Sequence, residues 1–385
     1  MMTNSMYIQG GTLYHADGSE IKHPLIEIRD GKVVSVTTAI EAPSDADVFH
    51  VADDDVILPG MIDLHIHGSY GADVMDGTNE ALAMMSRTLP KEGVTAYLAT
   101  TITDEEQTIE QALKNVAGYY HDRGAELLGV HLEGPFISPL QAGAQPKEAI
   151  RQPDAATFRR WQQLADGYIR LVTFAPEEEG GLELLDAMTD LGVISSIGHS
   201  HATYDVIQEA EKRGLTHATH LFNGMRPLHH REPGVVGSIY LSKQLKAELI
   251  FDGVHVSPEV ARLSWQILGS DRLMLITDAM RGKGLGDGDF ELGGQPVAIR
   301  NREARLSDGT LAGSVLTMDQ AVRHALKLPG IQWTDIVKVT SYNQAKSLKI
   351  DDRKGALKPG YDADIVVMTQ DGTVKNTWCK GVERQ

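Results

Sequence analysis

The amino-acid sequence predicts an α/β protein: a (β/α)8 TIM barrel with a small β-sandwich domain built from both chain termini. Three observations support this prediction. Eight short apolar runs alternate with helix-like stretches, which is the pattern of a barrel. Both ends of the chain instead consist of short strand-like runs joined by turns. Histidines and acids gather where the apolar runs end, at the edge where barrels carry their functional residues.

The two β-rich ends share the same turn chemistry. Near the start, "LIEIRDGKVVSV" alternates apolar and polar residues around an Asp30-Gly31 hairpin signal. Near the end, "GALKPGYDADIVVMTQDGTVKNTWCKG" places Pro-Gly and Asp-Gly turns between apolar runs. We therefore expect one small domain from residues 1–58 and 352–385, with the barrel, residues 59–351, inserted between them.

The central segment repeats one unit, an apolar run followed by a helix-like stretch. The predicted helices include 103–121, which opens with the cap-like pair Thr103-Asp104, 203–214, which ends on a glycine, and 257–269, which begins with Ser-Pro. An open α/β sheet is the alternative, but its usual glycine-rich phosphate loop does not follow the first run. The eight predicted strands are 61–68, 93–101, 126–134, 169–177, 192–200, 215–223, 247–255 and 271–279.

Composition narrows the classes of partner. The chain has 385 residues, 42% hydrophobic and 23% charged, which is typical of a folded soluble protein. No run of about 18 apolar residues predicts a membrane span, and the N-terminus does not resemble a secretory signal. The single cysteine, Cys379, fits a reducing cytoplasm. A net charge of −17 argues against a nucleic-acid partner, although a small anion remains possible where cations gather in one pocket.

Good metal ligands occur at the ends of the predicted strands. His65 and His67 are two apart in one strand and so share a face. A lone histidine there is usually only polar, Glu133 alone could cap a turn, and Asp278 alone could be a solvated loop residue. Because parallel strand ends meet on one face of a barrel, the joint pattern predicts a divalent-metal site there. The strand-end residues in question are His65, His67, Glu133, His199, His220 and Asp278.

Short motifs in this order resemble a known family. "PGMIDLHIHG" is similar to the opening metal motif of the amidohydrolase superfamily. More narrowly, nearly the whole chain resembles the N-acetylglucosamine-6-phosphate deacetylase family. The resemblance implies a metal-dependent barrel that removes acetate from N-acetylglucosamine 6-phosphate in amino-sugar catabolism. It also implies a cytosolic homodimer in which the neighbouring subunit helps to hold the phosphate. The motifs are "HLEGPFISPLQAGAQP", "GHSHA", "THLFNGM", "REPGVVG", "DGVH", "LITDAM" and "LAGS".

The same resemblance implies roles for individual residues. Glu133, His199 and His220 would be the principal metal ligands, and His65 with His67 would build a second site. One or two divalent ions per subunit are then expected, with zinc or iron the first candidates. Gln145 stands where some members have a histidine that polarises the acetyl carbonyl, which leaves open whether Gln145 or a metal does so here. The substrate contacts implied are Ala144, Gln145, Asn223, Gly224, Arg231, His255, Leu311, Ala312 and Gly313.

Amide hydrolysis explains why such residues are needed. A divalent ion lowers the pKa of a bound water to roughly 7, so that hydroxide becomes available at neutral pH. Asp278 would accept the proton of this water and return it to the departing nitrogen. Arg231 offers a planar fork suited to phosphate oxygens, although a surface arginine paired with Glu232 is the plainer interpretation.

Two other hypotheses remain. The first is an amidohydrolase that acts on a different N-acyl or cyclic amide; several of these use a carboxylated lysine after the fourth strand, whereas here that strand ends "TFAPEEEG". The second is a non-catalytic barrel that serves as a scaffold. Against the scaffold, every position of the predicted metal site carries a competent ligand.

Overall fold

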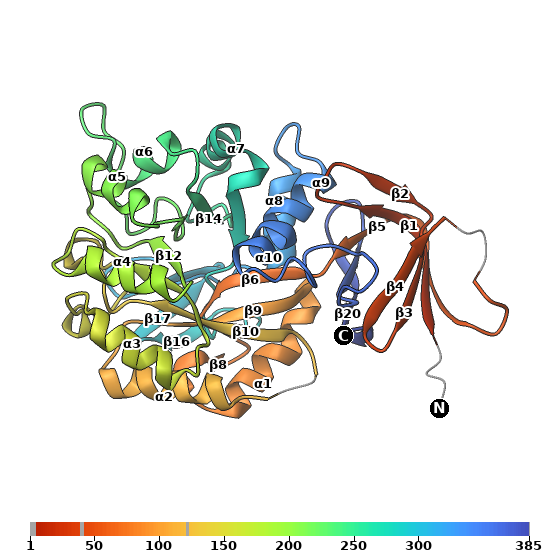
Figure 1. Cartoon of the computed structure of the whole chain (residues 1–385), viewed down its shortest axis with the longest axis horizontal. Helices are drawn as coiled ribbons and strands as arrows, with labels where there is room; N and C mark the ends of the chain where they lie inside the picture. Colours follow the sequence, from red (N-terminus) through yellow and green to blue (C-terminus); the bar gives the residue numbers. More distant parts are fainter. Residues whose placement is uncertain (1–4, 39–41, 121–122, 385) are drawn as a thin grey trace.

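The computed structural model describes residues 5–38, 42–120 and 123–384. Eight parallel strands lie side by side in chain order around a barrel (Figure 1). The first and eighth strands approach each other through a parallel bridge between Ile66 and Ala279, and Thr277 Oγ1 donates to Asp63 Oδ2 at 2.6 Å. All eight predicted strands are confirmed. They are β6 (Met61–Ile66), β9 (Val94–Thr101), β10 (Glu126–Glu133), β11 (Ile169–Phe174), β12 (Ile194–Ile197), β13 (His217–Ala218), β14 (Lys246–Ile250) and β15 (Leu273–Ile276).

Helices cover the outside of this barrel, so its strands are buried on both faces. The predicted helices correspond to α2, α5 and α7. Ser257 caps α7 as expected, whereas α2 begins after Glu105 rather than at Thr103-Asp104. His121, the last residue of the first predicted helix, lies outside the described residues. The helices are α1 (Asn79–Thr88), α2 (Glu106–Gly118), α3 (Ala155–Leu164), α4 (Gly181–Asp190), α5 (Tyr204–Lys212), α6 (Gly234–Leu241), α7 (Pro258–Arg272), α8 (Met318–Leu326), α9 (Trp333–Val337), a π-helical turn η5 (Lys338–Tyr342) and α10 (Asn343–Ser347).

The two termini form a second sheet beside the barrel, as predicted (Figure 1). This sheet encloses its own apolar core, which includes Ile8, Ile26 and Trp378. The fold class is thereby confirmed, while the limits 1–58, 352–385 and 59–351 remain a prediction. The strands are β1 (Met6–Tyr14), β2 (Glu20–Lys22), β3 (Leu25–Arg29), β4 (Lys32–Thr37), β5 (Asp47–Pro59), β19 (Ile365–Met368), β20 (Val374–Cys379) and β21 (Val382–Arg384).

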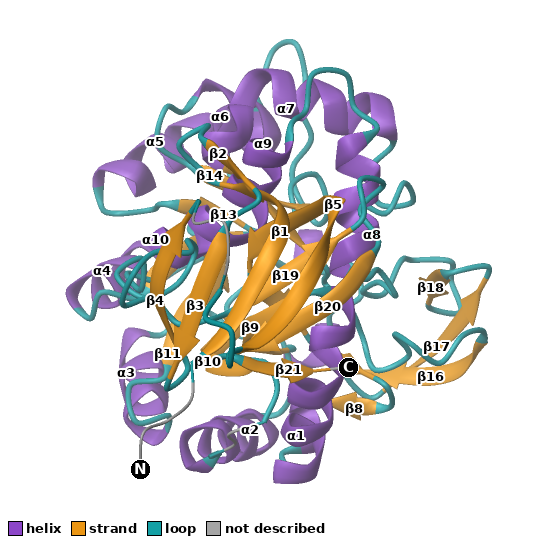
Figure 2. Cartoon of the chain, turned by 90° about the vertical axis from the view of Figure 1, so that its right-hand side faces the viewer, coloured by secondary structure: helices purple, strands orange, loops and turns teal. Residues whose placement is uncertain are grey.

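A small antiparallel sheet after the eighth barrel strand was not predicted. It consists of β16 (Gly288–Leu292), β17 (Gln295–Arg300) and β18 (Glu303–Arg305), and it projects from the body of the molecule in Figure 2. Its apolar face packs on Ile102, which follows β9, and on Met280, which follows β15. Because both residues lie at the carboxyl ends of barrel strands, this sheet covers one side of the barrel mouth.

Several short elements complete the chain. Within the described residues, no helix combines the length and the apolar character needed to cross a bilayer. The short elements are β7 (Gly68–Ser69), β8 (Ala72–Asp73), and the 3-10 turns η1 (Val74–Asp76), η2 (Leu89–Glu92), η3 (Pro139–Gln141) and η4 (Lys147–Ala149).

Candidate functional site

Three predicted metal ligands converge at the barrel mouth. Glu133 is the last residue of β10, His199 follows β12, and His220 follows β13. Glu133 Oε1 lies 3.0 Å from His220 Nε2 and 3.2 Å from His199 Nε2, and the two imidazole nitrogens are 3.1 Å apart. All three side chains are buried. Their ligand atoms therefore face one point at the barrel mouth.

The backbone is strained where these side chains turn inward. His199, His220 and Asp278 have positive φ angles of 46°, 30° and 47°, a region that non-glycine residues rarely occupy and that costs about 1–3 kcal/mol each. Gly224 has a structural reason to be glycine, because a Cβ there would lie 2.7 Å from His199 Nδ1. Such strain is typical of positions that the surrounding fold holds for a functional purpose.

The hydrogen-bond partners fix which nitrogen of His199 faces Glu133. His199 Nδ1 lies 2.9 Å from the carbonyl oxygen of Gln141, and a carbonyl only accepts, so this nitrogen carries the proton. In the neutral ring, Nε2 then presents a lone pair to the carboxylate of Glu133 and to His220. Buried lone pairs that face one another need a cation between them. Two imidazoles and one carboxylate are a donor set that divalent metals prefer, so these residues fit a metal ion.

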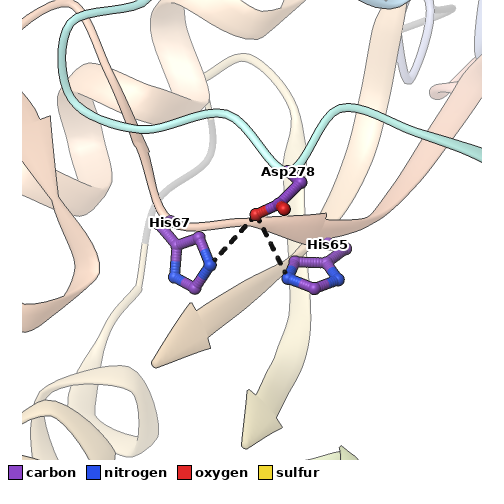
Figure 3. A group of neighbouring side chains, drawn as sticks. All are labelled: His65, His67 and Asp278. Atoms are coloured by element: carbon purple, nitrogen blue, oxygen red, sulfur yellow. Dashed lines mark ion pairs between the residues drawn. The ribbon is translucent and has the colours of Figure 1, made fainter. Parts of the chain in front are cut away.

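A second group of ligand atoms, drawn in Figure 3, lies beside Glu133 of the first. His65 Nε2 and His67 Nε2 lie 3.4 Å and 3.2 Å from Asp278 Oδ1. The same two nitrogens lie 3.5 Å and 3.2 Å from the Glu133 carboxylate. His65 Nε2 is buried and has no hydrogen-bond partner. Glu133 thus stands between two groups, each able to hold a cation.

The pKa shifts in the second group also indicate a place for positive charge. Burial opposes a charge on His65, but Asp278 and Glu133 raise its pKa well above the ordinary value. Burial likewise opposes charge on His67, yet hydrogen bonds to Asp278 and Glu133 raise its pKa to about 9. Burial favours neutral Asp278, but His65 and His67 lower the pKa of its carboxyl. The acids are therefore ionised and require positive charge beside them, as protons or as metal.

Gln145 is bound to a metal-ligand candidate. Its Nε2 donates to Glu133 Oε2 at 2.9 Å, and its Oε1 accepts from the backbone N–H of Thr103 at 2.9 Å. Because the Thr103 N–H only donates, the orientation of the Gln145 amide is fixed with its NH2 group toward Glu133. One hydrogen of this amide is thus committed to the carboxylate.

The two groups open into a cavity of about 350 Å³ that also holds most of the predicted substrate contacts. Asn223 Nδ2 donates to the carbonyls of His220 and Leu221. His255 Nδ1 donates to Asp252 Oδ2 at 2.7 Å, which leaves Nε2 unprotonated in the neutral ring. The predicted residues that line the cavity are His67, Glu133, Ala144, Gln145, His199, His220, Asn223, Gly224, His255, Asp278, Leu311 and Gly313.

Three predicted site residues do not line this cavity. His65 is fully buried beside it, and Ala312 is buried between two residues that do line it. Arg231 is exposed in the loop before α6, where its NH1 lies 2.7 Å from His230 Nε2. The alternative interpretation, a surface pair with Glu232, is not what the structure has, because Glu232 Oε1 instead accepts from the backbone of Tyr204 and Gly234.

Sequence reasoning missed other residues at the site. Glu248, in β14, is fully buried and contacts His65. A lone carboxylate inside the apolar run "AELIF" was the available signal. Arg305 and Thr310 line the cavity from the unpredicted sheet and the loop after it, together with Leu292 and Ile102. Nothing in the sequence pattern connects these four with the strand ends.

His217, the first residue of β13, does not line this cavity and yields a pH prediction. Burial, followed by the charge of Lys246, lowers its pKa to about 3. The unfolded chain binds a proton at this side chain below about pH 6.5, whereas the folded chain does not, so stability is full above that pH and falls toward about pH 3. From about pH 7 to pH 5 we expect the loss of roughly 2 kcal/mol. Urea unfolding of the unmodified chain and of His217→Gln at both pH values measures this loss of stability. An equal loss in the variant would exclude His217 as its cause.

Comparisons with known proteins identify the family of this chain. Residues 56–384 match the amidohydrolase family model. The N-acetylglucosamine-6-phosphate deacetylase of Bacillus subtilis (strain 168) is 49% identical over 366 residues, covering 94% of this chain and 92% of the relative.

Solved structures extend the match to three dimensions. A mutant N-acetyl-D-glucosamine-6-phosphate deacetylase of Mycobacterium smegmatis, in complex with N-acetyl-D-glucosamine-6-phosphate, superposes with a TM-score of 0.91 at 30% identity, covering 99% of both chains. The N-acetylglucosamine-6-phosphate deacetylase of Thermotoga maritima superposes with a TM-score of 0.87 at 35% identity, again covering 99% of both. The chain therefore belongs to the amidohydrolase family and, within it, to the group of N-acetylglucosamine-6-phosphate deacetylases.

Proposed function

We propose that this chain hydrolyses N-acetylglucosamine 6-phosphate to acetate and glucosamine 6-phosphate, as a metal-dependent enzyme of amino-sugar catabolism. One observation carries the proposal: Glu133, His199 and His220 face a single point in the same cavity that Asp278 lines. The close relatives named above bear the same activity in their names. A complete set of ligands also argues against the scaffold alternative.

The charge at the barrel mouth supports two ions per chain. Glu133, Asp278 and Glu248 are three buried carboxylates. In the part of the chain that the structure describes, none of them forms an ion pair with a lysine or arginine. We propose that Glu133, His199 and His220 hold one ion and that His65, His67 and Asp278 hold the other, with zinc or iron as candidates. A divalent ion bound there would supply a water of lowered pKa, roughly 7, and polarise a carbonyl.

The chain's own residues then move the proton and orient the sugar. We assign to Asp278 the general base, whose carboxylate accepts the proton of the attacking water. The same carboxyl returns this proton to the departing sugar nitrogen, so that a neutral amine leaves. Asn223, His255 and the backbone of Leu311, Ala312 and Gly313 would orient the hexose. Because one N–H of Gln145 serves Glu133, only its other N–H is free for the acetyl oxygen.

The exposed position of Arg231 supports a homodimer in which this residue reaches the neighbouring cavity. Large apolar side chains are exposed around the same loop and on the two helices that follow it. They are Leu228, Leu241, Leu263 and Ile267. Burying such a surface against a second copy would bring Arg231 toward a phosphate held by the partner.

The proposed activity is tested by acetate release. Metal-loaded protein is assayed with N-acetylglucosamine 6-phosphate, N-acetylgalactosamine 6-phosphate and N-acyl amino acids. We expect turnover of the glucosamine derivative and little of the amino acids. The proposal fails if the sugar phosphate is not hydrolysed, and hydrolysis of the amino acids alone would favour the other amidohydrolase hypothesis.

Replacing Arg231 tests the phosphate contact. We expect Arg231→Ala to raise KM for the phosphorylated sugar by about 10–100-fold, because a charged hydrogen-bond pair is lost, with little change in kcat. Arg159→Ala is the control, since Arg159 pairs with Asp190 on an outer helix. Equal losses on phosphorylated and unphosphorylated sugar would instead indicate a structural arginine.

A further inference from the structure

Glu248 is a carboxylate in the barrel interior that the proposed reaction does not use. It lies in the middle of β14, the seventh barrel strand, and is fully buried. Its Oε2 lies 3.1 Å from His65 Nδ1 and 3.4 Å from the backbone N of His220. Its Oε1 has no hydrogen-bond partner. Burial of a carboxylate away from any lysine or arginine is costly, so this one requires an explanation.

Glu248 fixes the protonation of His65. An ionised carboxylate only accepts hydrogen bonds, so His65 Nδ1 must carry the proton. In the neutral ring, His65 Nε2 then presents its lone pair toward Asp278 and Glu133, 3.4 Å and 3.5 Å away. A carboxylate behind a ligating histidine orients the ring and raises its basicity. Here the carboxylate lies on the side of His65 away from the cavity.

A different explanation is that Glu248, His65 and His131 themselves enclose an ion, since their ligand atoms lie within 4.8 Å of one another. The contacts of His131 argue against it. Its Nδ1 lies 3.1 Å from the carbonyl oxygen of Leu64, and its Nε2 lies 2.7 Å from Thr173 Oγ1. Both nitrogens of His131 are thereby engaged with the barrel.

We infer that Glu248 is a positioning residue for the second metal site: it holds His65 with Nδ1 protonated, so that Nε2 can bind the ion shared with His67 and Asp278. The inference rests on the proposed metal-dependent function. It predicts that Glu248 affects the second ion more strongly than the first, because Glu248 contacts the imidazole of His65 but only the backbone N of His220. The selective loss distinguishes positioning from general destabilisation.

The test measures metal affinity in the whole protein. Metal-stripped protein is titrated with Zn²⁺ against a chromophoric chelator, and bound zinc is counted by mass spectrometry. Glu248→Met removes the carboxylate at similar volume, and His67→Ala marks the ion of the second group. Ser196→Ala is the matched control, since Ser196 is buried in β12 and bonds Thr219 rather than a ligand.

We expect two ions in the unmodified chain and in Ser196→Ala. In Glu248→Met, the second ion, which His67→Ala also loses, should bind about 10–100-fold more weakly, and the first ion should be affected much less. Unchanged affinity for both ions, or equal weakening of both in a folded variant, would overturn the inference. So would an unmodified chain that binds only one ion.

A second measurement needs no folded Glu248 variant. In zinc-loaded protein with ¹⁵N-labelled histidine, the His65 signals are identified by their absence from His65→Asn. Protonation at Nδ1 supports the inference, and protonation at Nε2 overturns it. Failure of the deacetylase proposal would give a different result: the unmodified protein would still bind two zinc ions but would release no acetate.

Discussion

Asp278→Asn is expected to lower the rate of acetate release by about 10²–10⁴-fold while the protein keeps the ion of Glu133, His199 and His220. The amide of asparagine has nearly the shape of the carboxyl group but neither accepts nor returns a proton at neutral pH. Asp278 lines the cavity, and its Oδ1 faces His65 and His67, a position that supports its proposed role toward both the water and the sugar nitrogen. We expect the loss in kcat, with KM little changed.

Steady-state kinetics together with metal analysis check this prediction. Asp289→Asn is a suitable control because Asp289 is exposed on the small sheet and pairs with Arg300. Full activity in Asp278→Asn would remove Asp278 from the mechanism. Loss of the second ion along with activity, while Glu133, His199 and His220 still held the first ion, would show that Asp278 acts chiefly as a ligand.

The strands and most of the site followed from the sequence because each depends on local order. Alternating His65 and His67, and Glu133 at the end of an apolar run, are positions that a strand fixes by its period of two. Barrel closure then brings strand ends together without further information. β13 contains only His217 and Ala218, so His217 lies in the strand whereas His220 lies in the loop after it. The sequence pattern alone does not show where this strand ends.

Contacts between segments far apart in the chain were beyond such reasoning. Gln145 meets Glu133 through a loop whose path no periodicity predicts. Glu248 meets His65 across 183 residues, and its role depends on which face of β14 points inward. The positive φ angles of His199, His220 and Asp278 belong to the same class, because tertiary packing imposes them against local preference. The small sheet β16–β18 interrupts the alternation of strand and helix, so a repeat-based prediction passes over it.

Glu133→Ala should have the broadest effect of any single replacement, because this carboxylate faces both groups of ligands. Its Oε1 lies within 3.2 Å of His199 and His220, and its Oε2 lies 3.2 Å from His67. We expect both ions to be lost and acetate release to fall by about 10³-fold or more, since metal activation is worth several kcal/mol. Metal content and activity of the purified variant measure this, with exposed Glu148→Ala as the control.

Comparison with chelation separates the ligand role of Glu133 from a role in folding. Chelator-treated unmodified protein should lose activity to the same extent and recover it when zinc is returned. Glu133→Ala should fold, as judged by circular dichroism, yet it should not recover activity at the same zinc concentration. The imidazoles of His199 and His67 would then lack the carboxylate that lies between them. Recovery at the zinc concentration that suffices for the unmodified chain would mean that Glu133 is not a ligand.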